Sequence, residues 1–294
     1  MTRSELLAIR FHEDVALFRE AVNFTAAQTA FAARLVEKDY FCTLLLAYLA
    51  GATGKSVVFK GGTCLSKVIG DFYRLSEDLD FAVSMPVDSS REQRRRHAAA
   101  AKDAVAGVAE RLSAFTVHEP LRGANNSTQY VGAVGYSSPV SGQAETIKVE
   151  ISLREPLLAP VMDASVRTIL LDPVSGKPLV PEVKVPCISK AEALAEKFRA
   201  ALTRQEVAIR DFYDLDYAVR KLGMRPQDAG LVELVRQKLA VPGNDPVDVG
   251  PGRLANLRRQ LETRLRPVLR QRDYEEFDLD RAFTAVTVMA RLLR

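Results

Sequence analysis

The sequence is poor in the residues that form disulfides or bind soft metals. Its 294 residues include three cysteines, Cys42, Cys64 and Cys187, which lie far apart and form no CxxC pair. A disulfide framework and a cysteine-ligated zinc site are therefore disfavoured. The three histidines are equally scattered, which disfavours a histidine metal site and a Ser-His-Asp triad. Any metal is expected on carboxylates, and such ligands favour magnesium, with manganese as the alternative.

The sequence also lacks a long apolar run. Its uncharged apolar stretch Phe41 to Gly54 has 14 residues, whereas a transmembrane helix needs roughly 20. We therefore expect a buried helix at this place and no membrane partner. The N-terminal segment MTRSELLAIRFHED has no continuous apolar region and contains acidic residues early, unlike a secretory signal. The sequence thus predicts a cytoplasmic protein.

The composition is that of a soluble globular chain, with 47% hydrophobic and 27% charged residues. The net charge is only +4, but the segment Pro251–Arg294 contains ten Arg, no Lys and six acidic residues. A second basic block, Arg91, Arg94, Arg95 and Arg96 with Lys102, stands at the start of a predicted long helix. An anionic partner such as RNA would suit both basic segments. Solvated helical faces account for them equally well.

The periodicity of apolar residues changes along the chain and predicts an α+β protein with two lobes. Helical spacing covers residues 4–50, 64–72 and 88–113, and alternation predicts strands at 56–60 and 75–84. From 115 to 185 the pattern is β, in the segments FTVHE, TQYVGAVGY, ETIKVEISL, VRTILL and VKVP. After Pro186 it is helical, at 188–202, 207–222, 228–239, 253–270 and 279–293. We expect a mixed-sheet lobe with N-terminal helices over residues 1–186 and a helical lobe over 187–294.

Asp78 and Asp80 are the first candidates for chemistry. Side chains alternate along a strand, so these two carboxylates share one face while Leu79 and Phe81 share the other. Neighbouring carboxylates repel one another, and a divalent cation relieves that repulsion. The alternative is an edge strand with acidic residues that face the solvent.

The turn Gly61-Gly62-Thr63 is the second candidate, because it joins a predicted strand to a predicted helix. Paired glycines allow the main chain to approach a ligand closely, and a helix start attracts anions. The Thr63 hydroxyl could cap the helix or touch a phosphate. An ordinary turn with a helix cap is the alternative for this segment taken alone.

Together, the turn and the two-carboxylate strand would place a triphosphate beside its metal ions, as two-metal nucleotidyl transfer requires. Glu150 could add a third carboxylate, because it alternates with Ile147, Val149 and Ile151 and so points away from the apolar face. A surface strand face made by Lys148 and Glu150 explains the same pattern.

These motifs resemble those of a known family. The string GGTxLxK, followed by RLSEDLDF, is similar to the AbiEii-type nucleotidyltransferase toxins, a family of the DNA-polymerase-β-like nucleotidyltransferase superfamily. Two downstream segments, EALAEKFRAAL at 192–202 and RDFYDL at 210–215, look like the second half of the family pattern. The resemblance covers about 160 residues, from Phe59 to Asp216, with the motifs in the same order. It implies a polymerase-β-like sheet with flanking helices in the N-terminal lobe.

The resemblance also implies roles for individual residues. The nucleotide would be bound by Gly61, Gly62, Thr63, Lys67 and Lys197. Magnesium would be held by Asp78 and Asp80, and Asp211 would position or deprotonate the acceptor. Glu150 as a third metal ligand rests on the strand pattern and not on the resemblance. The alternative from the residues alone is that Lys197 is a solvated helix residue and that Asp211 and Asp214 form a surface ion-pair cluster of little energetic weight.

We expect a magnesium-dependent enzyme that transfers a nucleotide from an NTP to an acceptor. The resemblance implies an RNA acceptor such as tRNA, a cognate antitoxin, inhibition of growth or translation, and a place in toxin–antitoxin or phage-defence systems. A nucleotidyltransferase that modifies a protein or a small molecule is one alternative. The other is a catalytically silent module that binds a nucleotide or an antitoxin.

Overall fold

The computed structural model describes residues 10–294. The N-terminal segment MTRSELLAIRFHED, which does not resemble a secretory signal, therefore lies mostly outside the described residues. The chain divides into two compact units, Met1–Ile188 and Ser189–Arg294. None of the helices between residues 10 and 294 combines the length and the apolar character that a membrane crossing requires.

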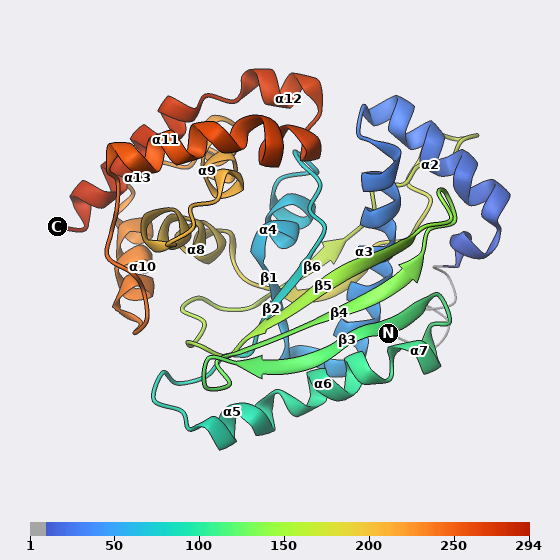
Figure 1. Cartoon of the computed structure of the whole chain (residues 1–294), viewed down its shortest axis with the longest axis horizontal. Coiled ribbons are helices and arrows are strands. Elements are labelled where there is room, and N and C mark those ends of the chain that lie inside the picture. The colour runs from blue at the N-terminus through green and yellow to red at the C-terminus, as the bar shows by residue number, and fades with distance from the viewer. Residues whose placement is uncertain (1–9) are drawn as a thin grey trace. The chain divides into compact units, whose positions relative to one another are not determined.

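A seven-stranded mixed sheet forms the centre of the first unit (Figure 1). Its spatial order is β3-β4-β5-β2-β1-β7-β6. The central strand β2 runs antiparallel to β1 and parallel to β5, and β1 runs parallel to β7. The strands are β1 (Val58–Lys60), β2 (Leu79–Ala82), β3 (Phe115–Ala124), β4 (Gln129–Ser137), β5 (Ala144–Ser152), β6 (Met162–Val166) and β7 (Val183–Cys187).

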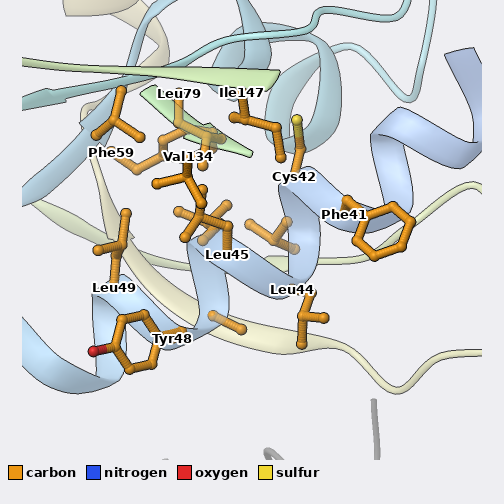
Figure 2. Packing of buried hydrophobic residues seen from close by; sticks show 14 of the residues in the cluster. Phe41, Cys42, Leu44, Leu45, Tyr48, Leu49, Phe59, Leu79, Val134 and Ile147 are labelled. Carbon is orange, nitrogen blue, oxygen red and sulfur yellow. The ribbon is translucent and has the colours of Figure 1, made fainter. Parts of the chain in front are cut away.

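Helices cover the apolar face of this sheet. The predicted buried helix is confirmed, because the uncharged run lies within α3, which packs Leu45 and Leu49 against sheet residues such as Leu79 (Figure 2). The hydroxyl of Tyr48 on α3 donates a hydrogen bond to the carbonyl of Ala104 on α6. The helices of this unit are α2 (Val15–Thr29), α3 (Ala33–Thr53), α4 (Gly61–Cys64), α5 (Arg91–His97), α6 (Ala99–Ala106) and α7 (Val108–Arg111). One wide π-helical turn, Leu65–Ile69, continues α4.

The predicted long helix at 88–113 is wrong, since the chain forms three short helices there. Ser90 caps α5 in a capping box with Gln93. Three arginines of the basic block, Arg94, Arg95 and Arg96, consequently lie in the last turn of α5, where the helix dipole favours cations, whereas Arg91 is the first residue of the helix. Arg94 is buried and donates to the carbonyl of Val87 at 2.8 Å, so it does not belong to an exposed basic surface.

The predicted strand at 166–171 is also wrong in position, because β6 covers Met162–Val166 and ends where the predicted strand begins. The chain turns away from the sheet to reach α3. There the Thr168 hydroxyl and the Ile169 N–H both donate to Oδ2 of Asp39 at 2.9 Å. The other carboxylate oxygen of Asp39 forms an ion pair with Lys67, which also donates to Thr43 Oγ1 at 2.8 Å. The buried carboxylate of Asp39 thus connects α3 to the segment after β6 and to the helical turn after α4.

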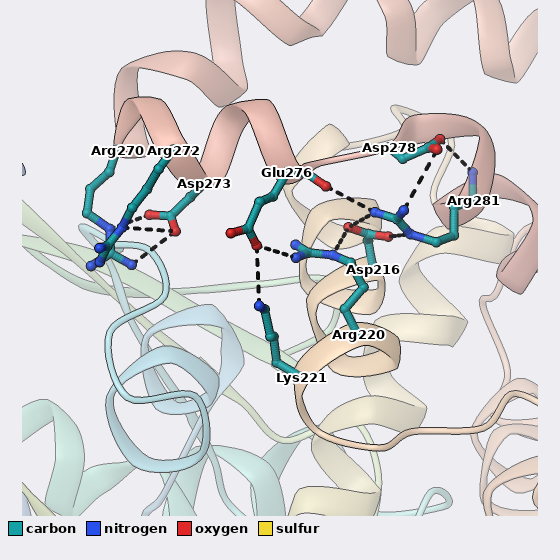
Figure 3. Close-up of polar contacts among 9 residues, drawn as sticks. All are labelled: Asp216, Arg220, Lys221, Arg270, Arg272, Asp273, Glu276, Asp278 and Arg281. Atoms are coloured by element: carbon teal, nitrogen blue, oxygen red, sulfur yellow. Dashed lines mark hydrogen bonds and ion pairs between the residues drawn. The ribbon is translucent and has the colours of Figure 1, made fainter.

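The second unit contains helices and no β-strands (Figure 1). The carboxylate of Asp216 on α9 is fully buried and accepts from Arg220 at 2.8 Å and from Arg281 on α13 at 2.6 Å (Figure 3). The short helix α12 was not predicted. A π-helical turn at Leu261–Leu265 precedes it in the chain. The helices are α8 (Lys190–Thr203), α9 (Ile209–Lys221), α10 (Ala229–Ala240), α11 (Pro251–Gln260), α12 (Gln271–Glu276) and α13 (Leu279–Leu292).

The ion pair between Asp39 and Lys67 should be critical for stability. The side chains of Asp39 and Lys67 are 2% and 1% exposed, so Asp39→Ala leaves a buried ammonium group without its counter-charge. We expect the free energy of unfolding to fall by about 3–5 kcal/mol in urea denaturation. The exposed pair between Asp163 and Lys55 serves as the control, and Asp163→Ala should cost about 1 kcal/mol or less. Equal losses in the two variants would contradict this account.

Candidate active site

Strand β2 places one carboxylate on the polar face of the sheet. Leu79 and Phe81 are buried in the core, so Asp80 between them points to the opposite face. Across the sheet, Asp80 lies opposite Lys60 of β1 and opposite Glu150 of β5. Asp78 comes one residue before β2 and is half-buried like Asp80.

The two glycines of the turn leave room for side chains of the segment 74–80. Gly61 has a φ of +76°, and a Cβ atom added there would lie 2.2 Å from Oδ2 of Asp80. A Cβ atom added to Gly62 would lie 2.4 Å from Nη2 of Arg74. A larger residue at position 61 would clash with the carboxylate of Asp80 and be strained by the positive φ, whereas one at position 62 would have to displace the end of the Arg74 side chain. The carboxylate of Asp80 and the guanidinium of Arg74 therefore pack directly on the turn.

Thr63 makes the third contact of the turn. Its buried hydroxyl donates a hydrogen bond to the main-chain carbonyl of Asp78. Helix α4 already begins at Gly61, so Thr63 is not the cap at its start, and the expected capping role is wrong. The hydroxyl proton is committed to Asp78, which leaves the main-chain N–H of Thr63 as its donor for a phosphate.

Glu150 is paired with a lysine on its own strand. Its Oε2 accepts from Nζ of Lys148 at 2.9 Å. Burial disfavours the charged carboxylate, yet the hydrogen bond and the charge of Lys148 outweigh it and hold the pKa of Glu150 below its usual range. Among residues 10–294, no three His, Cys, Asp or Glu side chains are arranged to hold a metal ion. Glu150 is thus not brought together with Asp78 and Asp80 as a third ligand.

The remaining pair, Asp78 and Asp80, fits the coordination habits of magnesium. This ion is commonly held by one or two carboxylates and takes its other ligands from substrate phosphates and water. The carboxylate of Asp80, held against the main chain of the glycine turn, could bind such an ion beside phosphates at the turn. The donor set of the structure therefore suits a metal that arrives with a nucleotide.

Lys67 does not lie on this polar face as a free cation. Its side chain is almost fully buried, and its ammonium group is engaged by Asp39 and Thr43. The lysine of the GGTxLxK string thus anchors the helix that follows the turn to α3. The structure therefore contradicts the expectation that Lys67 binds the nucleotide.

The second unit brings Lys197 and Asp211 together. Nζ of Lys197 on α8 lies 2.7 Å from Asp211 and 2.8 Å from Asp214, both on α9. Arg204 binds the other oxygen of Asp211 at 2.9 Å. Asp214 is fully buried and Lys197 is only 13% exposed, so the expectation of a solvated surface cluster is wrong. The group is electrically balanced, with two cations and two carboxylates.

One residue of these clusters, Arg74, was not foreseen from the sequence. It stands in the string RLSEDLDF, but nothing in that pattern shows that its guanidinium packs on Gly62. Asp214 was recognised as lying on the same helical face as Asp211, but its burial was not expected. Lys148 alternates in phase with Glu150 and was recognised as part of a charged strand face.

Comparison with solved structures shows what this fold is similar to. The crystal structure of JHP933 from Helicobacter pylori has 16% sequence identity and a TM-score of 0.52, over 90% of this chain and 93% of that one. MenT4, a nucleotidyltransferase toxin from Mycobacterium tuberculosis, has 19% identity and a TM-score of 0.48, over 99% of each chain. No curated protein matches the sequence.

A family model gives the more specific result. The model of the nucleotidyl transferase AbiEii toxin, type IV toxin–antitoxin system, matches residues 43–286. This range includes the glycine turn, the Asp78–Asp80 pair and the cluster around Lys197. The chain therefore belongs to the AbiEii nucleotidyltransferase toxin family.

Proposed function

We propose that the protein is a magnesium-dependent toxin that transfers a nucleotide from an NTP to an RNA acceptor such as tRNA. Family membership supplies the nucleotidyltransferase activity and implies an antitoxin partner. The observation that carries the metal-dependent mechanism is the contact between Asp80 and Gly61, which puts a carboxylate on the turn assigned to phosphate binding. Growth inhibition in the cytoplasm, as part of phage defence, belongs to the same proposal.

In this reaction, a bond forms between an acceptor oxygen and the α-phosphorus, and the bond from that phosphorus to the oxygen of the pyrophosphate leaving group breaks. Asp78 and Asp80 would hold magnesium, which neutralises the charge that develops on the phosphates. Gly61, Gly62 and Thr63 would bind the phosphates through the main chain. Each of these residues is fixed by contacts within the turn and the segment 74–80.

The roles of Lys197 and Asp211 follow from the family resemblance. Lys197 would contact the nucleotide phosphates, and Asp211 would position the acceptor hydroxyl or take its proton. The ion pairs of Lys197 with Asp211 and Asp214 support a preorganised cation, because they fix the ammonium group in one place. The same pairs make Lys197 important for folding, so its chemical role needs a control for stability.

An RNA acceptor draws modest support from charge. Within the C-terminal segment, several arginines are engaged in ion pairs: Arg258 with Asp280, Arg266 with Glu262, Arg270 with Asp273, and Arg281 with Asp216. Exposed cations such as Arg95 and Arg259 remain for an anionic partner. Because much of the basic excess is neutralised internally, a protein or small-molecule acceptor stands as the second candidate.

Incubation with each labelled NTP, magnesium and total cellular RNA tests the proposal. We expect the label to enter RNA with the wild type. Transfer should fall by orders of magnitude with Asp80→Asn, which keeps the shape of the side chain and removes a ligand charge. Asp163→Asn, an exposed strand aspartate of the same unit, is the control and should keep full activity. Label in protein or a small molecule, with none in RNA, would favour the second candidate, and unchanged transfer with folded Asp80→Asn would reject the metal site.

A matched pair of lysine variants tests the role of Lys197. Lys238 is also buried in the second unit, where it pairs with Glu192 at 2.7 Å, but it lies outside the family motifs. Lys197→Met and Lys238→Met should both lower the melting temperature, since each removes a cation that pairs with a buried carboxylate.

Only Lys197→Met should also lower kcat/KM for the NTP, by about 10- to 100-fold per folded molecule, as expected for one charged hydrogen bond. Steady-state kinetics, corrected for the folded fraction, measures this effect. Equal kcat/KM values for the two variants would show that Lys197 is a structural residue alone.

A further inference from the structure

Lys148 lies on the same face of the sheet as the acidic residues of the candidate site. Strands β2 and β5 are parallel neighbours, with Leu79 opposite Val149 and Asp80 opposite Glu150. Residues two apart on a strand share a face, so Lys148 points to the side of Glu150 and Asp80. Continuing the register by one residue puts Lys148 beside Asp78.

The surroundings of Lys148 keep it positively charged. Its Nζ donates to Oε2 of Glu150 at 2.9 Å. Burial disfavours the ammonium form, but the hydrogen bond to Glu150 and the negative charges of Glu150, Asp78 and Asp80 outweigh it and raise the pKa of Lys148. The ammonium group of Lys148 thus lies close enough to Asp78, Asp80 and Glu150 to interact with their charges.

We propose that Lys148 is a positioning residue that serves as the fixed counter-charge of the acidic site. It holds Glu150 in an ion pair, so that a divalent cation is bound by Asp78 and Asp80 without Glu150. This inference rests on the proposed metal-dependent function and specifies its ligand set.

The charge balance explains what such a lysine does. The carboxylates of Asp78, Asp80 and Glu150 lie on the polar face, where Lys60 and Lys148 supply positive charge beside them. Without Lys148, the face would be more negative and Glu150 would be free to coordinate a metal. Lys148 therefore keeps the affinity for a free divalent cation low. Tight binding then depends on the additional ligands that nucleotide phosphates provide.

Titration of the full-length protein with Mn²⁺ in the absence of nucleotide, followed by electron paramagnetic resonance of the free ion, tests this proposal. Lys148→Met should tighten the apparent Kd for Mn²⁺ by about tenfold or more, because one repelling charge is removed and one carboxylate is released. The double variant Lys148→Met with Glu150→Gln should lose that gain. Lys148→Arg, which keeps the charge, should bind Mn²⁺ like the wild type.

Lys184→Met is the matched control. Lys184 is an exposed strand lysine on β7, three strands from β5 and thus about 14 Å away across the sheet. Its substitution should leave the Kd unchanged. Lys148 is itself 48% exposed, so its variants should fold, and Lys148→Gln provides a second uncharged variant for the same comparison.

Two failures can be told apart with Asp80→Asn. If Asp80→Asn weakens Mn²⁺ binding while Lys148→Met and Lys148→Gln bind like the wild type, the role of Lys148 is rejected and the metal site stands. A gain that persists in the double variant also rejects the ion-pair argument. If Asp80→Asn leaves Mn²⁺ binding unchanged, or the wild type binds no Mn²⁺, the proposed metal site fails and the inference fails with it.

Discussion

The carboxylate of Asp80 occupies the space that a side chain at position 61 would need, and this close packing organises the candidate site. On the next residue, Gly62, the guanidinium of Arg74 packs in the same manner. One residue further, Thr63 donates its hydroxyl proton to the carbonyl of Asp78. Three consecutive residues of one turn thereby contact three residues of the segment 74–80, two by packing and one by a hydrogen bond. The turn assigned to phosphates and the carboxylates assigned to the metal cannot shift independently.

The sheet supplies the rest of the environment. Because β2 lies between an antiparallel and a parallel neighbour, Asp80 has a lysine opposite it on β1 and a glutamate opposite it on β5. The alternate residues of β2, Leu79 and Phe81, pack in the core with α3 and fix the strand. A rigid apolar face thus supports a polar face of mixed charge.

Local patterns predicted most of the elements but not the pairings between distant segments. Alternation around Leu79 and helical spacing around Leu45 were sufficient to identify β2 and α3, because burial imposes those periods directly. The partner of Lys67 is Asp39, 28 residues earlier, and no local pattern indicates such a pair. For the same reason the burial of Arg94 and the contact of Arg74 with Gly62 were not foreseen. The roles in nucleotide transfer came from motif resemblance, which identifies residue types without showing their contacts.

The contact between Gly61 and Asp80 is tested most directly by comparing label transfer from NTP in Gly61→Ala and Gly54→Ala. Both glycines have positive φ angles, +76° and +57°, so alanine is strained at either position and should cost about 1–3 kcal/mol of stability. An added Cβ atom meets Asp80 at position 61 and has nothing within 4 Å at position 54. The account predicts that Gly61→Ala loses transfer by about 100-fold or more per folded molecule while Gly54→Ala keeps it. Equal transfer by the two variants would contradict it.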